Sequence, residues 1–303
     1  MRGAAGVIFD AVGSFIVDDG WPIASHIAMS MLTSLFPFLI FLTALAGFLG
    51  TSDLVDVATK LIFETWPRVV AEPIAGEVQS VLTAPRGGLL TIGAVLALYF
   101  SSSAVEALRT GLNRAYDAID PRPWWRLRLQ SIMFMMVASF GLLALAFLVV
   151  LGPLIWAKIL DFAPQLAPLQ RLVTLARLGI ATIVLCVTLL LAHLWLPAIK
   201  LRFVDVIPGT ILTFVGSVGF GEAFGFYLSE FARNYVSTYA GLASVMITLV
   251  FLYSVAAIFV FGGELNAAIL RSGRRRDLKA RRAARRRSFF SGYGPSPPLG
   301  RQP

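Results

Sequence analysis

The chain has 303 residues, of which 57% are hydrophobic and only 14% are charged, and its formal net charge is +9. A soluble domain has about 45–50% apolar and about 25% charged residues, so this composition excludes an ordinary soluble fold and indicates a membrane protein. The excess positive charge lies near the C-terminus, so the net charge is a property of that segment and says little about the fold. Cys186 is the single cysteine, which excludes an intramolecular disulfide.

The first segment, residues 1–22, is expected to be cytoplasmic. It carries Asp10, Asp18 and Asp19 and has no apolar core in front of a small-residue cleavage site. We therefore expect no cleavable signal peptide, so the first membrane span has to direct insertion itself.

Six apolar stretches follow, and each is read as a transmembrane helix because a span needs about 20 mostly apolar residues. No stretch alternates like the strand of a membrane barrel. The sequence predicts an all-α, polytopic domain over 23–270, with spans at about 23–49, 88–105, 129–151, 172–196, 206–227 and 242–265.

Lys and Arg in the connecting segments indicate the orientation of the spans. The short segment 106–128 holds five arginines, and the residues after 270 hold many more, whereas the alternate loops hold few. The prediction is that both termini are cytoplasmic.

The first outer loop is expected to contain an amphipathic helix, which lies on the bilayer surface or caps the bundle. Its apolar residues recur at helical spacing between charged ones: Leu54, Val57, Leu61 and Ile62.

Residues 271–303 are predicted to be a disordered cytoplasmic tail, first basic and then rich in Pro, Gly and Ser. The cations expected to contact lipid are Arg274, Arg275, Arg276, Lys279, Arg281, Arg282, Arg285, Arg286 and Arg287. Cations beside a membrane helix are attracted to anionic headgroups by about 1 kcal/mol each. Nucleic acid binding is conceivable on charge alone, but no aromatic platform or folded reader accompanies the block. Anionic lipid is therefore the expected partner, and nucleic acid is not.

Two features indicate how the helices pack. Pro37 lies in the middle of the first span and removes one backbone hydrogen bond, which predicts a kink near Thr33. The fifth span carries small residues four apart, at Gly209, Thr213, Ser217, Gly221 and Gly225. Such a stripe lets helices approach closely. The plain interpretation is tight packing, and the alternative is a face that lines a substrate path or slides during gating.

Several polar residues are predicted to lie near the cytoplasmic ends of their spans: His26, Glu106, Arg109, Asn113, His193, Glu264 and Asn266. Charged groups at membrane depth tend to pair and to mark function. We hypothesise a polar layer in which Glu264 is paired with Arg109 or a histidine. The alternative is that each group reaches separately toward the interface. A second candidate pair, Arg177 with Glu222, is predicted at the outer side.

Four motifs in order along the chain resemble the YihY/BrkB family of bacterial inner-membrane proteins: SLFPFLIFL, SSSAVEALRTGLNRAYD, PGTILTF and FGGELNAAI. The resemblance covers about residues 20–270 and implies six helices with cytoplasmic termini in the inner membrane. The family has been labelled both virulence factor and ribonuclease BN, and transport roles have been proposed for it. The resemblance carries no agreed catalytic residues to this chain.

Transport of a solute or lipid is the leading functional interpretation, with no enzymatic activity and no cofactor or metal. Nuclease chemistry needs a metal cluster or an acid–base set open to a polyanion, and the chain has only two histidines and no paired-carboxylate motif in any loop. No nucleotide-binding loop of the G-x-x-x-x-G-K-[ST] type is present, so a gradient or a partner would supply the energy. The alternative is a membrane scaffold for the envelope, and a second copy of the chain or an envelope protein is left open as a partner.

Overall fold

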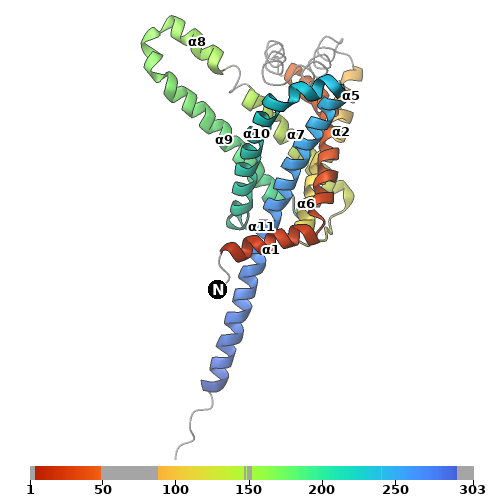
Figure 1. Ribbon diagram of the computed structural model, residues 1–303, viewed down its shortest axis with the longest axis vertical. Helices are drawn as coiled ribbons and strands as arrows, with labels where there is room; N and C mark the ends of the chain where they lie inside the picture. The colour runs from red at the N-terminus through yellow and green to blue at the C-terminus, as the bar shows by residue number, and fades with distance from the viewer. Residues whose placement is uncertain (1–3, 49–87, 147, 149–151, 240, 292–303) are drawn as a thin grey trace, which may run out of the picture.

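The computed structural model describes residues 4–48, 88–146, 148, 152–239 and 241–291 (Figure 1). The regular structure of these residues is helical, which confirms the all-helical fold class. The elements are α1 (Ala4–Val17), α2 (Gly20–Phe48), α5 (Gly88–Ser101), α6 (Ser103–Ala115), α7 (Trp124–Ala146), α8 (Gly152–Phe162), the short 3-10 helix η2 (Pro164–Leu169), α9 (Gln170–Trp195), α10 (Phe203–Tyr239) and α11 (Gly241–Ser291). The amphipathic helix predicted at 54–64 lies outside the described residues.

Among the described residues, five helical segments are long and apolar enough to cross a membrane: Gly20–Leu42, Trp124–Leu145, Pro164–Trp195, Phe203–Ser229 and Val245–Gly273. They correspond to the first, third, fourth, fifth and sixth predicted spans. The second predicted span, 88–105, is divided, because α5 ends at Ser101 and α6 begins at Ser103. The 14 residues of α5 cover about 21 Å, which is less than the hydrocarbon thickness of about 30 Å.

The division between α5 and α6 is occupied by buried serines. The hydroxyl of Ser101 donates to the carbonyl oxygen of Leu98 at 3.0 Å, and that of Ser102 donates to the carbonyl oxygen of Tyr99 at 2.7 Å. Such bonds to the preceding turn compete with the backbone ladder and often bend helices. The amphipathic α6 then carries the polar residues that the sequence placed at the end of one continuous span.

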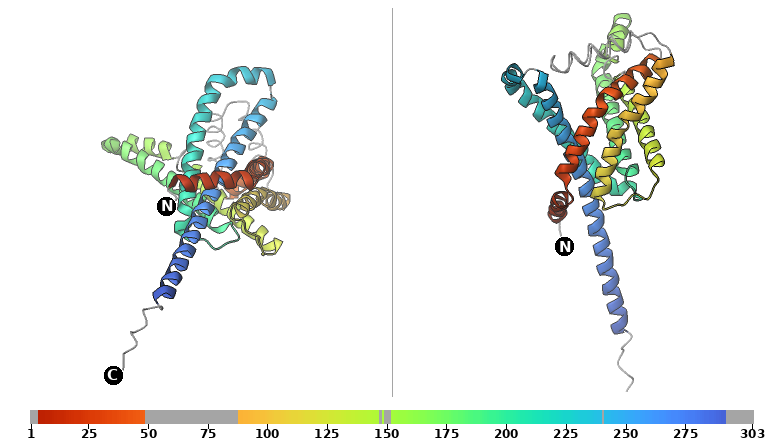
Figure 2. Two further views of the ribbon diagram at one scale, coloured as in Figure 1. Left: turned by 60° about the horizontal axis from the view of Figure 1, so that its bottom comes forward. Right: turned by 90° about the vertical axis from the view of Figure 1, so that its right-hand side faces the viewer.

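The segment expected as a cytoplasmic N-terminus contains a helix that the sequence analysis missed. Figures 1 and 2 show α1 lying crosswise at the end of the bundle from which α11 emerges. The chain turns from α1 into α2 at Asp19, whose φ of 60° lies in the left-handed region that aspartate tolerates better than most residues. Arg114 of α6 holds this corner, with its guanidinium 3.2 Å from the Asp19 carboxylate.

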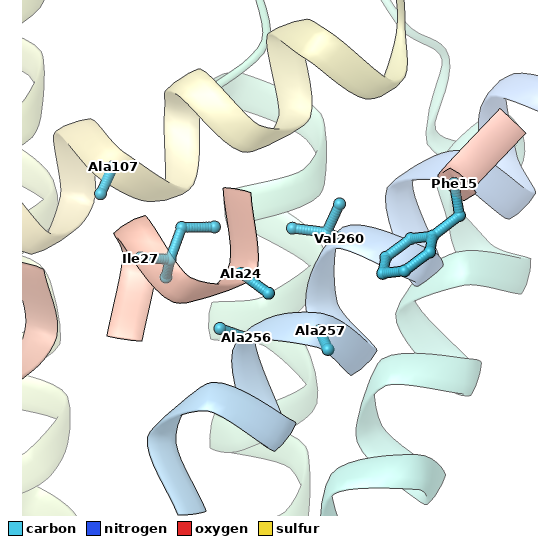
Figure 3. Close-up of a cluster of buried hydrophobic side chains, with 7 residues drawn as sticks. All are labelled: Phe15, Ala24, Ile27, Ala107, Ala256, Ala257 and Val260. Carbon is cyan, nitrogen blue, oxygen red and sulfur yellow. The ribbon is translucent and has the colours of Figure 1, made fainter. Parts of the chain in front are cut away.

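A buried cluster joins α1, α2, α6 and α11 at this end of the bundle (Figure 3). Its members are Phe15, Ala24, Ile27, Ala107, Ala256, Ala257 and Val260. Four of them are alanines, which allow the helices to approach closely where lipid provides no hydrophobic drive between spans.

The small-residue stripe of α10 packs along only part of its length. A Cβ atom at Gly209 would overlap the carbonyl oxygen of Gly262, and one at Gly262 would overlap the Thr213 hydroxyl. Gly221 and Gly225 have open space around them, while Ser217 is half-buried. The stripe is therefore a site of close α10–α11 packing at the Gly209 end and is not in tight contact at the Gly221–Gly225 end.

The farther half of the α10–α11 pair is filled by aromatic side chains instead. The rings of Phe220 and Phe224 have centroids 5.4 Å apart, and both lie about 6 Å from the ring of Phe251 on α11, at 6.0 and 5.8 Å. Pro37 lies within α2, which continues on both sides of it, and the kink stays a prediction.

Two elements extend away from the bundle (Figure 1). The first is the hairpin of α8 and the beginning of α9. The second is the end of α11, which continues to Ser291, whereas the sequence predicted a separate tail from residue 271. Arg, Lys and Ala are strong helix formers, so the basic stretch continues the helix of the last span. Residues 292–303 lie outside the described part of the chain.

Candidate functional site

Glu264 on α11 has a buried carboxylate, and the exposed fraction of this residue is 1%. Its Oε2 atom lies 3.4 Å from an Nη atom of Arg271, which is seven residues later on the same helix. The same guanidinium donates to the hydroxyl of Ser14 on α1 at 2.9 Å. The predicted partner of Glu264, Arg109 or a histidine, is therefore wrong, and Arg271 takes that place.

Arg109 on α6 is held elsewhere by α7. It donates to the carbonyl oxygen of Leu127 at 2.9 Å and to the hydroxyl of Ser131 at 3.0 Å, and Glu106 lies 3.9 Å away. Burial lowers the pKa of the Arg109 guanidinium, and the charge of Glu106 opposes that shift. An arginine remains a cation at working pH, so Arg109 is a fixed positive charge between α6 and α7.

Glu106 has a closer partner in Arg128 of α7, at 2.7 Å. The guanidinium carbon of Arg128 also lies 3.6 Å from the ring centroid of Tyr99 on α5, in a cation–π arrangement. Arg128 thus binds α7 to both sides of the division between α5 and α6.

His193 on α9 is fully buried against α10 and α11. Its Nδ1 atom lies 3.0 Å from the carbonyl oxygen of Leu189, which can only accept, so Nδ1 carries the proton. Its Nε2 atom lies 3.5 Å from the hydroxyl of Thr213, and its ring centroid lies 4.6 Å from that of Phe259.

The side chain of Asn266 on α11 forms hydrogen bonds with backbone groups of α10 on either side of a proline. Pro208 has no N–H and disturbs the helical hydrogen bonds near it. The Asn266 side chain accepts from the N–H of Gly209 at 2.7 Å and donates to the carbonyl oxygen of Val206 at 3.2 Å. Thr213 donates to the carbonyl oxygen of Gly209, which connects Asn266 to His193 through the packed stripe.

Asn113 belongs to a group of contacts at the end of α9. Its Oδ1 atom accepts from the N–H of Ala198 at 2.7 Å, and its Nδ2 atom donates to Asp120 at 3.4 Å. Asp120 forms two hydrogen bonds to the guanidinium of Arg122, at 2.6 and 2.7 Å, and Arg122 also donates to the carbonyl oxygen of Leu196. The cation therefore satisfies a carbonyl at the C-terminus of α9.

Arg122 also holds Asp120 in its charged form. The hydrogen bonds from Arg122 lower the pKa of the Asp120 carboxyl, and Asp120 in turn raises the pKa of Arg122.

The predicted polar layer is thus divided. His193 and Asn266 are linked through α10, Glu264 pairs with Arg271, Glu106 and Arg109 bind α7, and Asn113 binds the end of α9. His26 is exposed on α2. Both members of the second pair are described, and the structure forms no ion pair between them: Glu222 is exposed, and Arg177 packs beside Gly152 of α8.

Sequence analysis overlooked the partners Arg271, Arg128 and Arg122. A readable signal existed for Arg271, because residues seven apart share a helix face. Side chains from residue 274 onward are not described, so lipid contact by the basic segment stays a prediction. Within the described part of the chain, no three His, Cys, Asp or Glu side chains gather as metal ligands would.

Comparisons with known proteins agree with the membrane character of the chain. The family model described as virulence factor BrkB matches residues 11–287. The putative ribonuclease-like protein YfkH of Bacillus subtilis is 28% identical over 255 residues, which cover 84% of this chain and 92% of that protein. The UPF0761 membrane protein RC1_0578 of Rhodospirillum centenum is 27% identical over 281 residues, which cover 88% of this chain and 58% of that protein. No solved structure matches. With a family match that spans most of its length, this membrane protein belongs to the BrkB family.

Proposed function

We propose that the protein translocates a lipid or a small solute across the membrane without an ATPase of its own. The observation that carries this proposal is the buried carboxylate of Glu264, which is paired with Arg271 of its own helix. Ionisable groups within spans are costly and commonly mark the path of a substrate or proton. A substrate with a charged headgroup can compete for either member of the pair.

The surroundings of the pair support this role. Arg271 is 40% exposed while Glu264 is 1% exposed, so the pair extends from the interior of the bundle toward its end. Five residues before Glu264 on α11, Phe259 lies beside His193 of α9. Gly262 of α11 and Gly209 of α10 allow close packing between those two helices. A junction of small residues can shift without repacking large side chains.

The proposed topology is six spans with both termini in the cytoplasm of a bacterium, in its inner membrane. In this arrangement α5 together with the start of α6 forms the short second span, and the basic end of α11 meets the anionic leaflet. Cysteines placed at Ser288 and Leu169, labelled from outside intact cells with a membrane-impermeant maleimide, test it. Labelling at Leu169 and not at Ser288 is expected, and the reverse pattern contradicts the orientation.

We propose no nuclease activity, although one relative has a ribonuclease-like name. Phosphodiester hydrolysis requires an acid–base pair or a metal that is open to a polyanion. His193 is enclosed by Phe259, Thr213 and Leu189, and His26 stands alone on the surface of α2.

Scaffolding of the envelope is the second candidate, and the hairpin of α8 and α9 favours it. Apolar residues of this hairpin remain exposed along its length, including Phe162, Leu172, Leu175 and Ile183. A second copy of the chain or another membrane protein can bind such a surface.

Flux in sealed proteoliposomes separates the two functions. Fluorescent phospholipids and a panel of small ions and solutes are supplied, and transport by the wild type is compared with that of Glu264→Gln. The matched control is Glu222→Gln, which neutralises an exposed carboxylate in a neighbouring span. Flux that is lost in Glu264→Gln and kept in Glu222→Gln is expected. Absence of flux for every compound, together with a stable complex isolated from membranes, overturns transport in favour of the scaffold.

A further inference from the structure

Helix α1 has an apolar face that packs only in part against the bundle. Ala11 and Phe15 are buried against the other helices. Beside them, a second group of apolar residues is largely exposed: Ile8 at 53%, Phe9 at 80%, Val12 at 42%, Ile16 at 62% and Val17 at 77%. An exposed apolar surface of this extent on a 14-residue helix indicates that lipid or protein, and not water, covers it.

The contacts of α1 with α11 give the direction in which this face points. Phe15 packs edge-on against Phe261, with the ring centroids 5.9 Å apart, while Ser14 accepts a hydrogen bond from Arg271. Phe261 and Arg271 are ten residues apart, or about 15 Å along a helix. The Phe15 side of α1 therefore faces the depth of the apolar spans, and the Ser14 side faces the end at which α11 emerges.

Helical periodicity shows which other residues of α1 lie next to the Phe15 side and which lie next to the Ser14 side. Val12 and Ile8 precede Phe15 by three and seven residues, and Ile16 lies four residues after Val12, so the exposed apolar face adjoins the Phe15 side. Asp10 lies four residues before Ser14 and adjoins the opposite side. Apolar residues thus point toward the level of the spans, and the polar flank points toward the end of the bundle.

We propose that α1 lies in the plane of the membrane, with the face formed by Ile8, Phe9, Val12 and Ile16 embedded in the lipid leaflet at the Arg271 end. Trp21, at the corner between α1 and α2, contacts Phe15 with a centroid distance of 5.1 Å and is itself 54% exposed. Tryptophan at such a position is typical of the boundary between headgroups and acyl chains.

The occupant is the bilayer and not a protein partner, because bulky apolar residues form the exposed side of α1 and Asp10 lies on the other flank. Interfacial helices carry bulky apolar residues on one side and polar residues on the other, and they sink about 5–10 Å into the boundary of the acyl chains. The corner at Asp19 and the bond from Arg271 to Ser14 fix α1 crosswise, so it does not insert as a span.

Spin labels measure the depth of α1 directly. On a Cys186→Ser background, the full-length chain carries a single label at Phe9→Cys, Ile16→Cys or Asp10→Cys, in nanodiscs of phosphatidylethanolamine and phosphatidylglycerol. Power saturation compares collisions with oxygen, which enriches in acyl chains, and with a water-soluble nickel chelate. A label at Ile183→Cys, an exposed apolar residue within α9, gives the reference for a lipid-facing position.

The expected result is that labels at Phe9 and Ile16 collide with oxygen as the Ile183 label does and report a depth of about 5–10 Å below the phosphates, while the Asp10 label reports the aqueous phase. Access of the nickel chelate to Phe9 and Ile16 equal to that at Asp10 overturns the proposal. Protection of both positions from both reagents also overturns it, because protein then covers the face. Val12→Cys provides a second position on the same face if either variant fails to fold.

Discussion

Arg271 and Glu264 lie seven residues apart on α11 and meet at 3.4 Å, so the arginine reaches back over two turns to the buried carboxylate. Removing one partner of a buried pair leaves an uncompensated charge and typically costs about 3–5 kcal/mol. Because Arg271 is 40% exposed, we expect Arg271→Ala to lower the free energy of unfolding by less than that range, roughly 2 kcal/mol. The double variant Arg271→Ala/Glu264→Gln is expected to regain part of the loss.

A double-mutant cycle measured by thermal unfolding in detergent tests this pair. The cycle reports the coupling of the two side chains without requiring knowledge of a substrate. Additive losses for the two single variants would show that the pair does not stabilise the fold.

The glycines of the α10–α11 junction give a second prediction. We expect Gly209→Ala and Gly262→Ala to destabilise the protein by about 1–3 kcal/mol, because a Cβ atom at either position overlaps atoms of the facing helix. Gly221→Ala and Gly225→Ala are the matched controls on the same stripe, and they have open space. Melting temperatures of purified protein should fall for the first two variants alone. Equal behaviour of all four would contradict the asymmetric packing of the stripe.

Acid stability should depend on Asp120. Its pKa is lowered in the folded state by Arg122, so its ion pair stabilises the fold above the unfolded-state pKa of about 3.9, and that stabilisation is lost as pH falls through the lower folded-state pKa. Asp120→Asn removes this contribution, by roughly 1–2 kcal/mol at neutral pH. Unfolding measured from pH 7 down to pH 3 should show the difference between wild type and variant shrinking below about pH 4. A difference that stays constant over this range would show that Asp120 acts without its charge.

Arg128 is expected to be intolerant even of lysine. It contacts Glu106 at 2.7 Å and stacks over the Tyr99 ring at 3.6 Å, and a lysine cannot form both the planar stack and the forked hydrogen bonds. We expect Arg128→Lys to lose about 1 kcal/mol or more. Arg126→Lys is the control, because the guanidinium of Arg126 lies over the ring of its chain neighbour Trp125, at 5.0 Å, and so joins no two helices through that contact. Similar melting temperatures for the two variants would argue against a special role of Arg128.

The apolar spans could be predicted from composition because hydropathy accumulates over some 20 residues and tolerates errors at either end. The division of the second predicted span into two helices was not predicted, because it depends on single hydroxyl groups. Ser101 and Ser102 bind carbonyl oxygens of the preceding turn, and hydropathy averaged over a span does not register such bonds.

The site could be predicted in its residue types but not in its pairing. Glu264, His193 and Asn266 are all buried, as their apolar surroundings suggested. Arg109 was a predicted partner of Glu264, but in the structure it binds the hydroxyl of Ser131 and a carbonyl oxygen of α7. Tertiary packing decides whether Arg109 binds the acceptors on α7 or the carboxylate on α11. The spacing of residues in the sequence does not predict that choice. The helix α1 was missed for another reason, since Asp10 within it and Asp18 and Asp19 directly after it concealed the apolar spacing of its other residues.

The 51 residues of α11 form one continuous rod of about 76 Å, more than twice the hydrocarbon thickness of about 30 Å. The part beyond Arg271 is about 30 Å long, so a tilt of about 10° within the bilayer displaces its tip by roughly 5 Å. Motion of the segment beside Glu264 is thereby converted into a larger movement of positive charge outside the bundle, which makes the end of α11 a natural place to attach a distance reporter for rearrangements within the membrane.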